Sequence, residues 1–290
     1  MRFASIARRR VLLGGLSSLG AGAAPGDIAI PIEVSDGRCV VPVSLDGRGA
    51  RMILDTGAEI SVITGAAMAR IGLRRDPWVG TTLRGAGGLV ERRANVDVGV
   101  ALLGGVRLVQ HLPAGGLSLP VTSSDLGGAD GLLGGDVLRH YVIELDIPGA
   151  RLALHAPNTT PHGNGEVKLQ LLRGDLLLAP VVLDGHALTG LVDTGASTSL
   201  INARGLYRLG LVPALQVHDP AVPMQAVGGE SIVRRRQFSE LRIGALKLDA
   251  PTLLTETVPE AAYDLVLGLD VLGRRPLRLS YPGLTLQFIS

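Results

Sequence analysis

Short apolar runs separated by turn residues recur along most of the chain. In the first half, the runs 40–45 and 52–54 flank an Asp-Gly pair at 46–47, and the second half repeats this arrangement over 179–192. An Asp-Gly pair between two apolar runs is typical of a tight β-hairpin. The 290 residues include 40 glycines and 17 prolines, which implies many turns. The pattern predicts an all-β fold, mainly β with short helices.

The two halves of the chain contain the same motifs in the same order. Each half has a hairpin that leads into Asp-Thr-Gly-Ala, then a glycine-rich segment, an apolar-apolar-Gly triplet that follows an aspartate, and a closing strand pair. The matched segments are 52–58 and 191–196, 83–88 and 224–229, 130–138 and 264–272, and 141–154 and 277–288. Because order and spacing agree, the sequence predicts two lobes related by a pseudo-twofold axis, with a site between them.

Four segments follow from this repeat and from local composition. Residues 1–24 are predicted to be an export signal, and residues 25–157 are predicted to form the first lobe. The polar, turn-rich stretch 158–165 is the expected linker, and residues 166–290 form the second lobe.

The export signal is predicted from charge and hydropathy. Three arginines at 8–10 precede the apolar run 11–16 and the small residues 21–23, and consecutive arginines in this position resemble a twin-arginine signal. The run is shorter than the roughly 20 residues that cross a bilayer, so no stable membrane span is expected, with an uncleaved anchor as the alternative. We expect an exported protein, periplasmic or secreted.

Each half has an aspartate at the end of an apolar strand, Asp55 and Asp193. A buried ionised carboxylate without partners costs several kcal/mol. Two carboxylates that face each other across a pseudo-twofold axis can share one proton, which relieves their repulsion and provides an acid and a base. The ionised carboxylate would take a proton from water while the protonated one donates to a carbonyl oxygen. We therefore expect both residues to be catalytic.

The neighbours of the two aspartates have predicted supporting roles. Thr56 and Thr194 are expected to hydrogen-bond across the lobe interface and to hold the two loops in register. Gly57 and Gly195 are expected to let the backbone pass close to the carboxylates and donate to them. The glycine-rich segments are candidates for flaps that close over a bound peptide.

Both Asp-Thr-Gly-Ala motifs are followed by a serine, Ser61 and Ser199, and the two triplets lie at 132–134 and 266–268. In these motifs the chain resembles the retropepsin and pepsin superfamily of aspartic proteases, in a single-chain, tandem-lobed bacterial form. The resemblance implies that each triplet lies beside the strand bearing the Asp-Thr-Gly, with a short helix following. It also implies an aspartic endopeptidase that hydrolyses peptide bonds in extended polypeptides. A non-catalytic module that binds peptides in the same cleft is the alternative.

The expected site residues fall into three groups. They are the catalytic Asp55 and Asp193; the supporting Thr56, Gly57, Ala58, Thr194, Gly195 and Ala196; and the flap or substrate-binding Gly85, Ala86, Gly87, Gly88, Val227, Gly228, Gly229 and Glu59. Glu59 follows the first motif where Ser197 follows the second, so the two halves of the cleft should differ. By resemblance Glu59 could bind substrate amides; a solvated turn residue is the alternative.

Charge and composition exclude several other classes. The net charge of +2 depends on arginines within residues 1–24, so the body of the chain lacks the cationic excess of a nucleic-acid binder. The run 234–236 of three arginines is expected at a solvated strand edge, with substrate contact as the alternative. Six scattered histidines and one cysteine, Cys39, predict no metal, no cofactor and no disulfide. Cys39 is expected to be a buried apolar residue.

Two further expectations complete the sequence interpretation. Trp78 is expected in a local core, with the cleft wall as the alternative. Because both halves of the site lie on one chain, we expect a monomer whose partner is a peptide or protein substrate.

Overall fold

The computed structural model describes residues 29–84, 90–110, 115–159, 165–172, 174–211, 219–226, 229–256 and 262–289. The predicted export signal, the glycines and alanine at 85–88, the pair 227–228 and most of the predicted linker lie outside the described residues. Export and the lobe boundaries therefore stay predictions.

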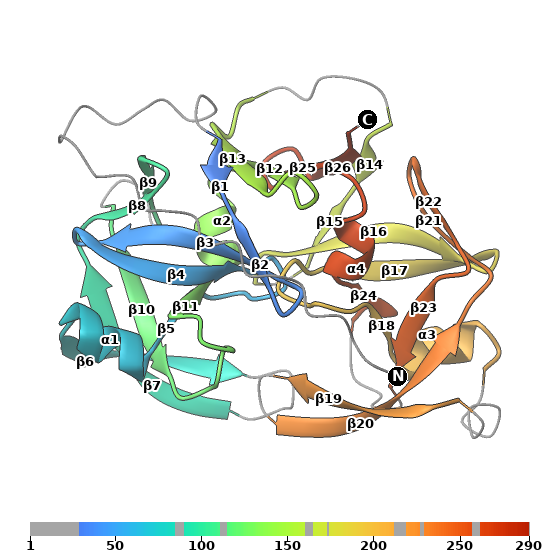
Figure 1. Cartoon of the computed structure of the whole chain (residues 1–290), viewed down its shortest axis with the longest axis horizontal. Helices are drawn as coiled ribbons and strands as arrows, with labels where there is room; N and C mark the ends of the chain where they lie inside the picture. The colour runs from blue at the N-terminus through green and yellow to red at the C-terminus, as the bar shows by residue number, and fades with distance from the viewer. Residues whose placement is uncertain are drawn as a thin grey trace, which may run out of the picture.

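Strands of the first half form one curled sheet, which is ten-stranded among the described residues (Figure 1). In spatial order its strands are β6 (Arg75–Arg84), β7 (Val90–Val98), β10 (Leu117–Thr122), β5 (Val62–Thr64), β11 (Gly131–Leu133), β4 (Arg48–Leu54), β3 (Arg38–Leu45), β8 (Ala101–Leu103) and β9 (Val106–Leu108), with β2 (Glu33–Ser35) also paired to β3. Helix α1 (Gly65–Ile71) follows β5, and α2 (Gly135–Leu138) follows β11.

The second half repeats this sheet, again with ten strands among the described residues. In the same spatial order they are β19 (Ala221–Ala226), β20 (Gly229–Gln237), β23 (Thr252–Thr255), β18 (Leu200–Ile201), β24 (Leu265–Leu267), β17 (His186–Val192), β16 (Leu176–Leu183), β21 (Glu240–Ile243) and β22 (Leu246–Asp249), with β15 (Gln170–Leu172) also paired to β16. Helices α3 (Ala203–Arg208) and α4 (Leu269–Leu272) stand where α1 and α2 stand in the first half. The all-β, two-lobed fold is confirmed.

A third sheet joins the lobes. Its order is β1 (Ile30–Pro31), β13 (Arg151–His155), β12 (Val142–Asp146), β25 (Leu277–Ser280), β26 (Thr285–Phe288) and β14 (Val167–Lys168). The predicted closing strand pairs therefore meet each other, because β12 pairs antiparallel with β25. Figure 1 shows this sheet along the top of the view, above the two curled sheets.

The two Asp-Gly hairpins have the predicted tight turns. Asp46 and Gly47 have φ angles of 47° and 79°, and Asp184 and Gly185 have 47° and 81°. Positive φ at both central residues is the type I′ turn, whose twist matches that of the flanking strands. Each hairpin thus delivers its second strand, β4 or β17, directly into an Asp-Thr-Gly loop.

The triplets lie where the resemblance implies. Leu133 of β11 pairs in parallel with Leu54 of β4, and Leu267 of β24 pairs in parallel with Val192 of β17. Each triplet therefore runs beside the end of the strand that carries an Asp-Thr-Gly, and a short helix follows it.

Cys39 is fully buried, as expected, and its burial raises the pKa of the thiol to about 12. The expected core position of Trp78 is wrong. Trp78 is 89% exposed, because β6 loses its regular pairing to β7 between Arg75 and Gly80.

The predicted strand edge at 234–236 holds only in part. Arg234 pairs on both sides, with Ala221 of β19 and Thr255 of β23, whereas Arg235 and Arg236 pair in register with β23 alone.

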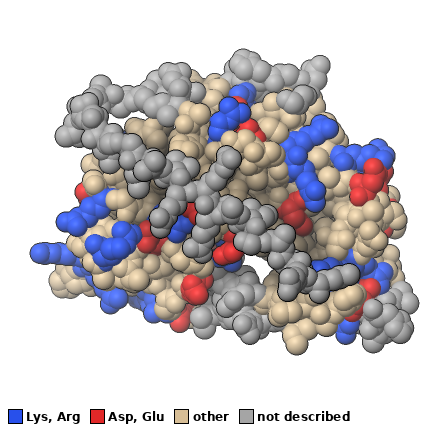
Figure 2. All heavy atoms as spheres, in the orientation of Figure 1, with Lys and Arg blue, Asp and Glu red and all other residues tan. Residues whose placement is uncertain are grey.

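Cationic and anionic side chains are interspersed over the face drawn in Figure 2. Within the described ranges, no helix is long and apolar enough to cross a membrane.

Candidate active site

The two Asp-Thr-Gly loops meet at the lobe interface through their threonines, which are fully or almost fully buried. The Thr56 hydroxyl donates to the carbonyl of Val192 at 2.7 Å and accepts the amide of Thr194 at 3.1 Å. The Thr194 hydroxyl donates to the carbonyl of Leu54 at 2.7 Å and accepts the amide of Thr56 at 3.1 Å. These four hydrogen bonds hold each loop against the opposite half of the chain.

The same loops bring the two aspartates together. A Cβ added to Gly57 would overlap the carboxylate of Asp193, and a Cβ added to Gly195 would overlap that of Asp55. Each carboxylate therefore packs on the glycine of the opposite loop, where only glycine fits. Each also accepts its own loop's amide, Gly57 to Asp55 at 3.0 Å and Gly195 to Asp193 at 2.9 Å.

Burial and mutual proximity change the pKa of both catalytic-site carboxyl groups, Asp55 and Asp193. Burial, followed by the negative charge of Asp193, raises the pKa of Asp55 well above its usual value. Burial also raises the pKa of Asp193, although the amides of Ala196 and Gly195 and a hydrogen bond from Asp55 oppose this. Two carboxyls in contact that both resist ionisation hold one proton between them over a wide pH range. Both residues keep some exposed surface, so water can reach them.

In each lobe, a serine that follows the Asp-Thr-Gly-Ala motif hydrogen-bonds to an aspartate that follows the triplet. The Ser61 hydroxyl donates to Asp136 at 2.6 Å and accepts the amide of Gly134 at 2.9 Å. Ser199 makes the same 2.6 Å contact with Asp270. The sequence interpretation did not assign roles to these two aspartates; their signal was an acid two residues after each triplet glycine.

The alanines of the two motifs connect the loops to the helices behind them. The carbonyl of Ala58 accepts the amide of Gly135 at 2.8 Å, and that of Ala196 accepts the amide of Leu269 at 2.8 Å. The supporting residues predicted from the sequence thus all lie in the two loops that carry Asp55 and Asp193.

Two hairpins carry the predicted flap segments. Strands β6 and β7 form one and β19 and β20 form the other, and they converge along the bottom of Figure 1. Of the predicted flap residues, only Gly229 belongs to the described residues, where it begins β20. The flap role stays a prediction.

Glu59 is exposed and lies at a contact between the halves. A Cβ added to Gly174, which precedes β16, would overlap its carboxylate. In the mirrored position, Gly37 lies against Ser197. Each lobe thus places the turn before its first long strand, β3 or β16, against the loop that follows the other lobe's motif. Both interpretations of Glu59 stay open.

Two small apolar clusters, separate from the main core, lie next to the aspartate loops. The first-lobe cluster comprises Val40, Ile53, Val62, Leu126, Ala129 and Leu132, packed by Ala58 and Leu83. The second-lobe cluster comprises Leu200, Val233 and Leu254, packed by Val222 and Met224. Since Ile53 and Ala58 flank Asp55, the first cluster lies on the aspartate-bearing face of its sheet.

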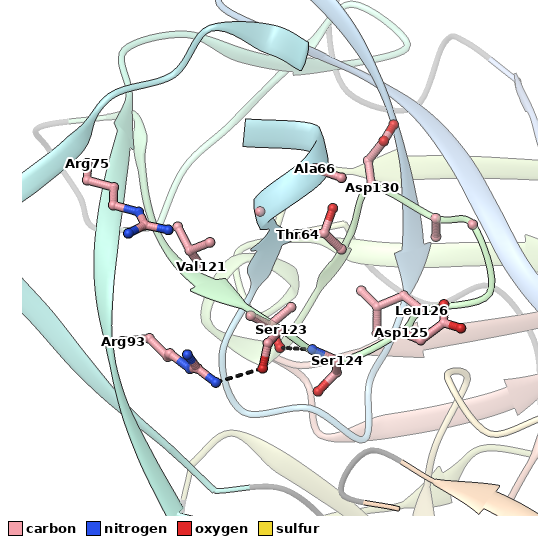
Figure 3. A pocket seen from close by; sticks show the side chains of 14 residues that line it. Thr64, Ala66, Arg75, Arg93, Val121, Ser123, Ser124, Asp125, Leu126 and Asp130 are labelled. Atoms are coloured by element: carbon pink, nitrogen blue, oxygen red, sulfur yellow. Dashed lines mark hydrogen bonds between the residues drawn. The ribbon is translucent and has the colours of Figure 1, made fainter. Parts of the chain in front are cut away.

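A pocket of about 510 Å³ opens beside the first-lobe cluster (Figure 3). It shares Leu126 and Ala129 with that cluster, and Arg93 crosses it to donate to the Ser123 hydroxyl at 2.6 Å. Neither Asp55 nor Asp193 lines it. Among the described residues, no group of three or more His, Cys, Asp or Glu is placed to hold a metal ion.

Paired carboxylates between two similar β lobes are the arrangement of an aspartic protease. Residues 41–137 match the family model "Aspartyl protease", and residues 179–274 match the model "gag-polyprotein putative aspartyl protease". Each lobe therefore matches separately, and the chain belongs to the retropepsin and pepsin-like aspartic protease superfamily.

One solved structure agrees with this chain in fold over most of its length. The aspartic proteinase from Irpex lacteus is 13% identical, with a TM-score of 0.55 over 89% of this chain and 95% of that one. A retropepsin-like aspartic protease from Rickettsia conorii is 17% identical, with a TM-score of 0.36 over 43% of this chain and 91% of that one. The comparison with curated proteins gave no match.

Proposed function

We propose that this protein is an aspartic endopeptidase that hydrolyses peptide bonds in extended polypeptides. The observation that carries the proposal is the pair Asp55 and Asp193, each packed on the glycine of the opposite loop and each with a raised pKa. Two carboxylates that share a proton serve as acid and base without a metal or a covalent intermediate.

The reaction follows from that shared proton. The ionised carboxylate takes a proton from a water molecule, whose oxygen attacks the scissile carbonyl carbon, while the protonated carboxyl donates to the carbonyl oxygen. The tetrahedral intermediate then collapses: the carbon–nitrogen bond breaks, the leaving nitrogen receives the proton that the base took from water, and the other carboxylate recovers a proton from a hydroxyl of the intermediate. The two apolar clusters favour substrates with apolar side chains near the scissile bond.

Export stays part of the proposal. A periplasmic or secreted location would bring the enzyme to unfolded or extended polypeptides outside the cytoplasm, and the arginines and apolar run at 8–16 support it.

The test is hydrolysis of a peptide library across a pH range by the purified protein. Asp55→Asn and Asp193→Asn should each abolish hydrolysis, because neither variant can share a proton. The matched control is Asp97→Asn, which changes an exposed carboxylate on β7. A statine-type inhibitor should bind tightly, since its hydroxyl occupies the place of the attacking water. Peptide binding without hydrolysis in the wild type would instead support the non-catalytic module.

A further inference from the structure

A pocket on the first lobe adjoins the catalytic site, but the proposed mechanism does not use it. This pocket of about 510 Å³ shares Leu126 and Ala129 with the first-lobe cluster, and Asp130 also lines it. The amide of Asp130 donates to the carbonyl of Arg51 at 2.7 Å, and Arg51 precedes Asp55 by four residues at the end of β4. Four residues of a strand span about 13 Å. An extended polypeptide whose scissile bond lies at the two carboxylates is therefore long enough to reach the pocket within about four residues.

The register of the β6–β7 hairpin places Arg93 on the side that faces the first-lobe cluster. Leu83 packs on that cluster, and Thr81 lies two residues before Leu83, on the same face of β6. Thr81 pairs with Arg93, and directly paired residues of antiparallel strands share a face. The Arg93 side chain follows this direction, since its Nη2 donates to the Ser123 hydroxyl at 2.6 Å on the pocket lining.

Two arginines of the pocket have free hydrogen-bond donors. Arg93 uses Nη2 both for Ser123 and for an ion pair with Glu91, whereas its Nη1 has no partner among the described residues and, unlike Nε, is not fully buried. Arg75, which also lines the pocket, makes no side-chain hydrogen bond or ion pair with another described residue. The Ser123 hydroxyl accepts from Arg93 and still has its own proton to donate. Guanidinium and hydroxyl donors together suit the two oxygens of a carboxylate.

The two acids that line the pocket lie away from the arginines. Figure 3 shows Asp125 and Asp130 on the side opposite to Arg75 and Arg93. Asp130 forms an ion pair with Arg70 at 2.7 Å, and Asp125 accepts a backbone amide two residues further along the chain at 2.9 Å. On the arginine side, the charge of Arg75 has no counter-ion among the described residues. This side of the pocket is therefore the one that attracts an anion.

The second lobe holds a valine at the position of Arg93. In its β19–β20 hairpin, Val222 pairs with Val233 as Thr81 pairs with Arg93. Met224, two residues after Val222, packs on the second-lobe cluster in the way that the β6–β7 hairpin packs on the first. Val233 is itself a buried member of that second cluster. Because an apolar residue cannot bind a carboxylate, this contact belongs to the first-lobe side of the site.

We propose that the arginine side of this pocket is a subsite for an acidic side chain of the substrate, within about four residues of the scissile bond. Arg75 and Arg93 bind the carboxylate, Ser123 donates to it, and Glu91 holds the Arg93 side chain in place. The subsite rests on the proposed endopeptidase function, because an extended polypeptide is the ligand that connects the catalytic pair with the pocket.

Hydrolysis of matched peptides by the full-length protein tests the subsite. The peptides share an apolar pair at the cleaved bond and carry Glu, Gln or Lys at one position, which is moved through the four residues on either side. At one or more of these positions, on one side of the bond, the wild type should prefer Glu over Gln by about 10-fold in kcat/KM, and Lys should be poorest. The preference should disappear as the pH falls below about 4.3, where glutamate becomes protonated. Equal rates for Glu and Gln at every position above that pH would overturn the proposal.

Variants of the two arginines separate the subsite from a general effect of charge. Arg93→Val, which copies the second lobe, and Arg75→Gln should each lower the preference for Glu by about 3-fold or more. Arg75 is exposed, so Arg75→Gln should fold even if Arg93→Val does not. The matched control is Arg92→Gln, an exposed arginine on the other face of β7, which should keep the wild-type preference. An equal loss of preference in Arg92→Gln and Arg75→Gln would contradict the proposal.

Peptide binding to the Asp55→Asn variant separates the subsite from the proposed function. Fluorescence anisotropy of labelled Glu and Gln peptides measures the same preference without turnover, and adding Arg75→Gln should reduce it. If the wild type hydrolyses no peptide but binding shows this Arg75-dependent preference, the endopeptidase function is wrong and the subsite remains for a bound peptide. If peptides are hydrolysed or bound without the preference, the subsite is wrong and the function is unaffected. Competition by free N-acetylglutamate as strong as that by the Glu peptide would assign the pocket to a small anion and overturn the proposal.

Discussion

The two aspartate loops with their supporting contacts, here called the floor, and the side chains around them, here called the walls, differ in how far the two lobes match. On the floor, the threonine contacts are 2.7 and 3.1 Å in both lobes, and both serine hydroxyls donate to an aspartate at 2.6 Å. On the walls, matched positions hold different residues: Arg38 and Leu176, Glu59 and Ser197, and Ala129 and Tyr263. Acid–base chemistry on a shared proton requires two equivalent loops. Recognition of a polypeptide, which has direction, requires walls that are not equivalent.

The largest effect should come from the glycines of the floor. In Gly57→Ala or Gly195→Ala the new methyl would overlap the opposite carboxylate and displace it. Because a displacement of about 1 Å costs about 100-fold in rate, we expect kcat/KM to fall by about 100-fold or more in both variants. The control is Gly49→Ala, since a Cβ there meets nothing within 4 Å. A large loss in one variant and none in the other would mean that the floor is not symmetric.

The threonines should contribute next. Thr56→Val leaves the carbonyl of Val192 and the amide of Thr194 buried without their partner, and Thr194→Val does the same in mirror image. Each should lower the free energy of unfolding by about 2 to 4 kcal/mol in urea titrations. The double variant should lose less than the sum, because both act on one interface. Additive losses would contradict this coupling.

Smaller losses of unfolding free energy are expected from the serines that support the two aspartate loops. Ser61→Ala and Ser199→Ala each remove one hydroxyl that donates to an aspartate and accepts a glycine amide. We expect each to cost about 1 to 3 kcal/mol of unfolding free energy. Thermal or urea unfolding of both variants measures this loss. If one variant falls within the expected range of unfolding free energy and the other does not, the two serines are not equivalent.

The smallest effect concerns stability and pH. The raised pKa of Asp55 means that the folded state holds a proton more tightly than the unfolded chain, where aspartate titrates near pH 3.9. Stability from that proton is complete below about pH 3.9 and is lost as the pH rises above it. Asp55→Asn should therefore raise the unfolding free energy at pH 7 by about 1 kcal/mol, and by less at pH 4. Asp97→Asn should show no such pH-dependent gain.

The repeat made most of the floor predictable from the sequence. Local signals sufficed for the Asp-Gly turns at 46–47 and 184–185, and the duplicated motif indicated that two aspartates should meet. Each of these inferences depends on residues close in sequence or on the equivalence of the two repeated halves. Neither kind of inference requires knowledge of the tertiary structure.

The walls were not predictable in this way. The run 234–236 was expected at an edge because its charges favour solvent, but Arg234 lies between two strands, and Arg236 forms an ion pair with Asp219 at 2.8 Å. Trp78 is exposed because strand pairing is interrupted, which hydropathy does not report. Glu59 lies against Gly174 of the second half, a contact that no local signal in the sequence indicates. All three depend on partners distant in sequence.

The reciprocal threonine contacts also limit how the molecule can open. Rotating one lobe away from the other would break four buried hydrogen bonds together, and it would separate β12 from β25 in the sheet that joins the lobes. We therefore expect the two aspartate loops to move together as one unit. For the proposed endopeptidase, extended or unfolded segments should reach the paired carboxylates, and compact, tightly folded proteins should resist attack until they begin to unfold.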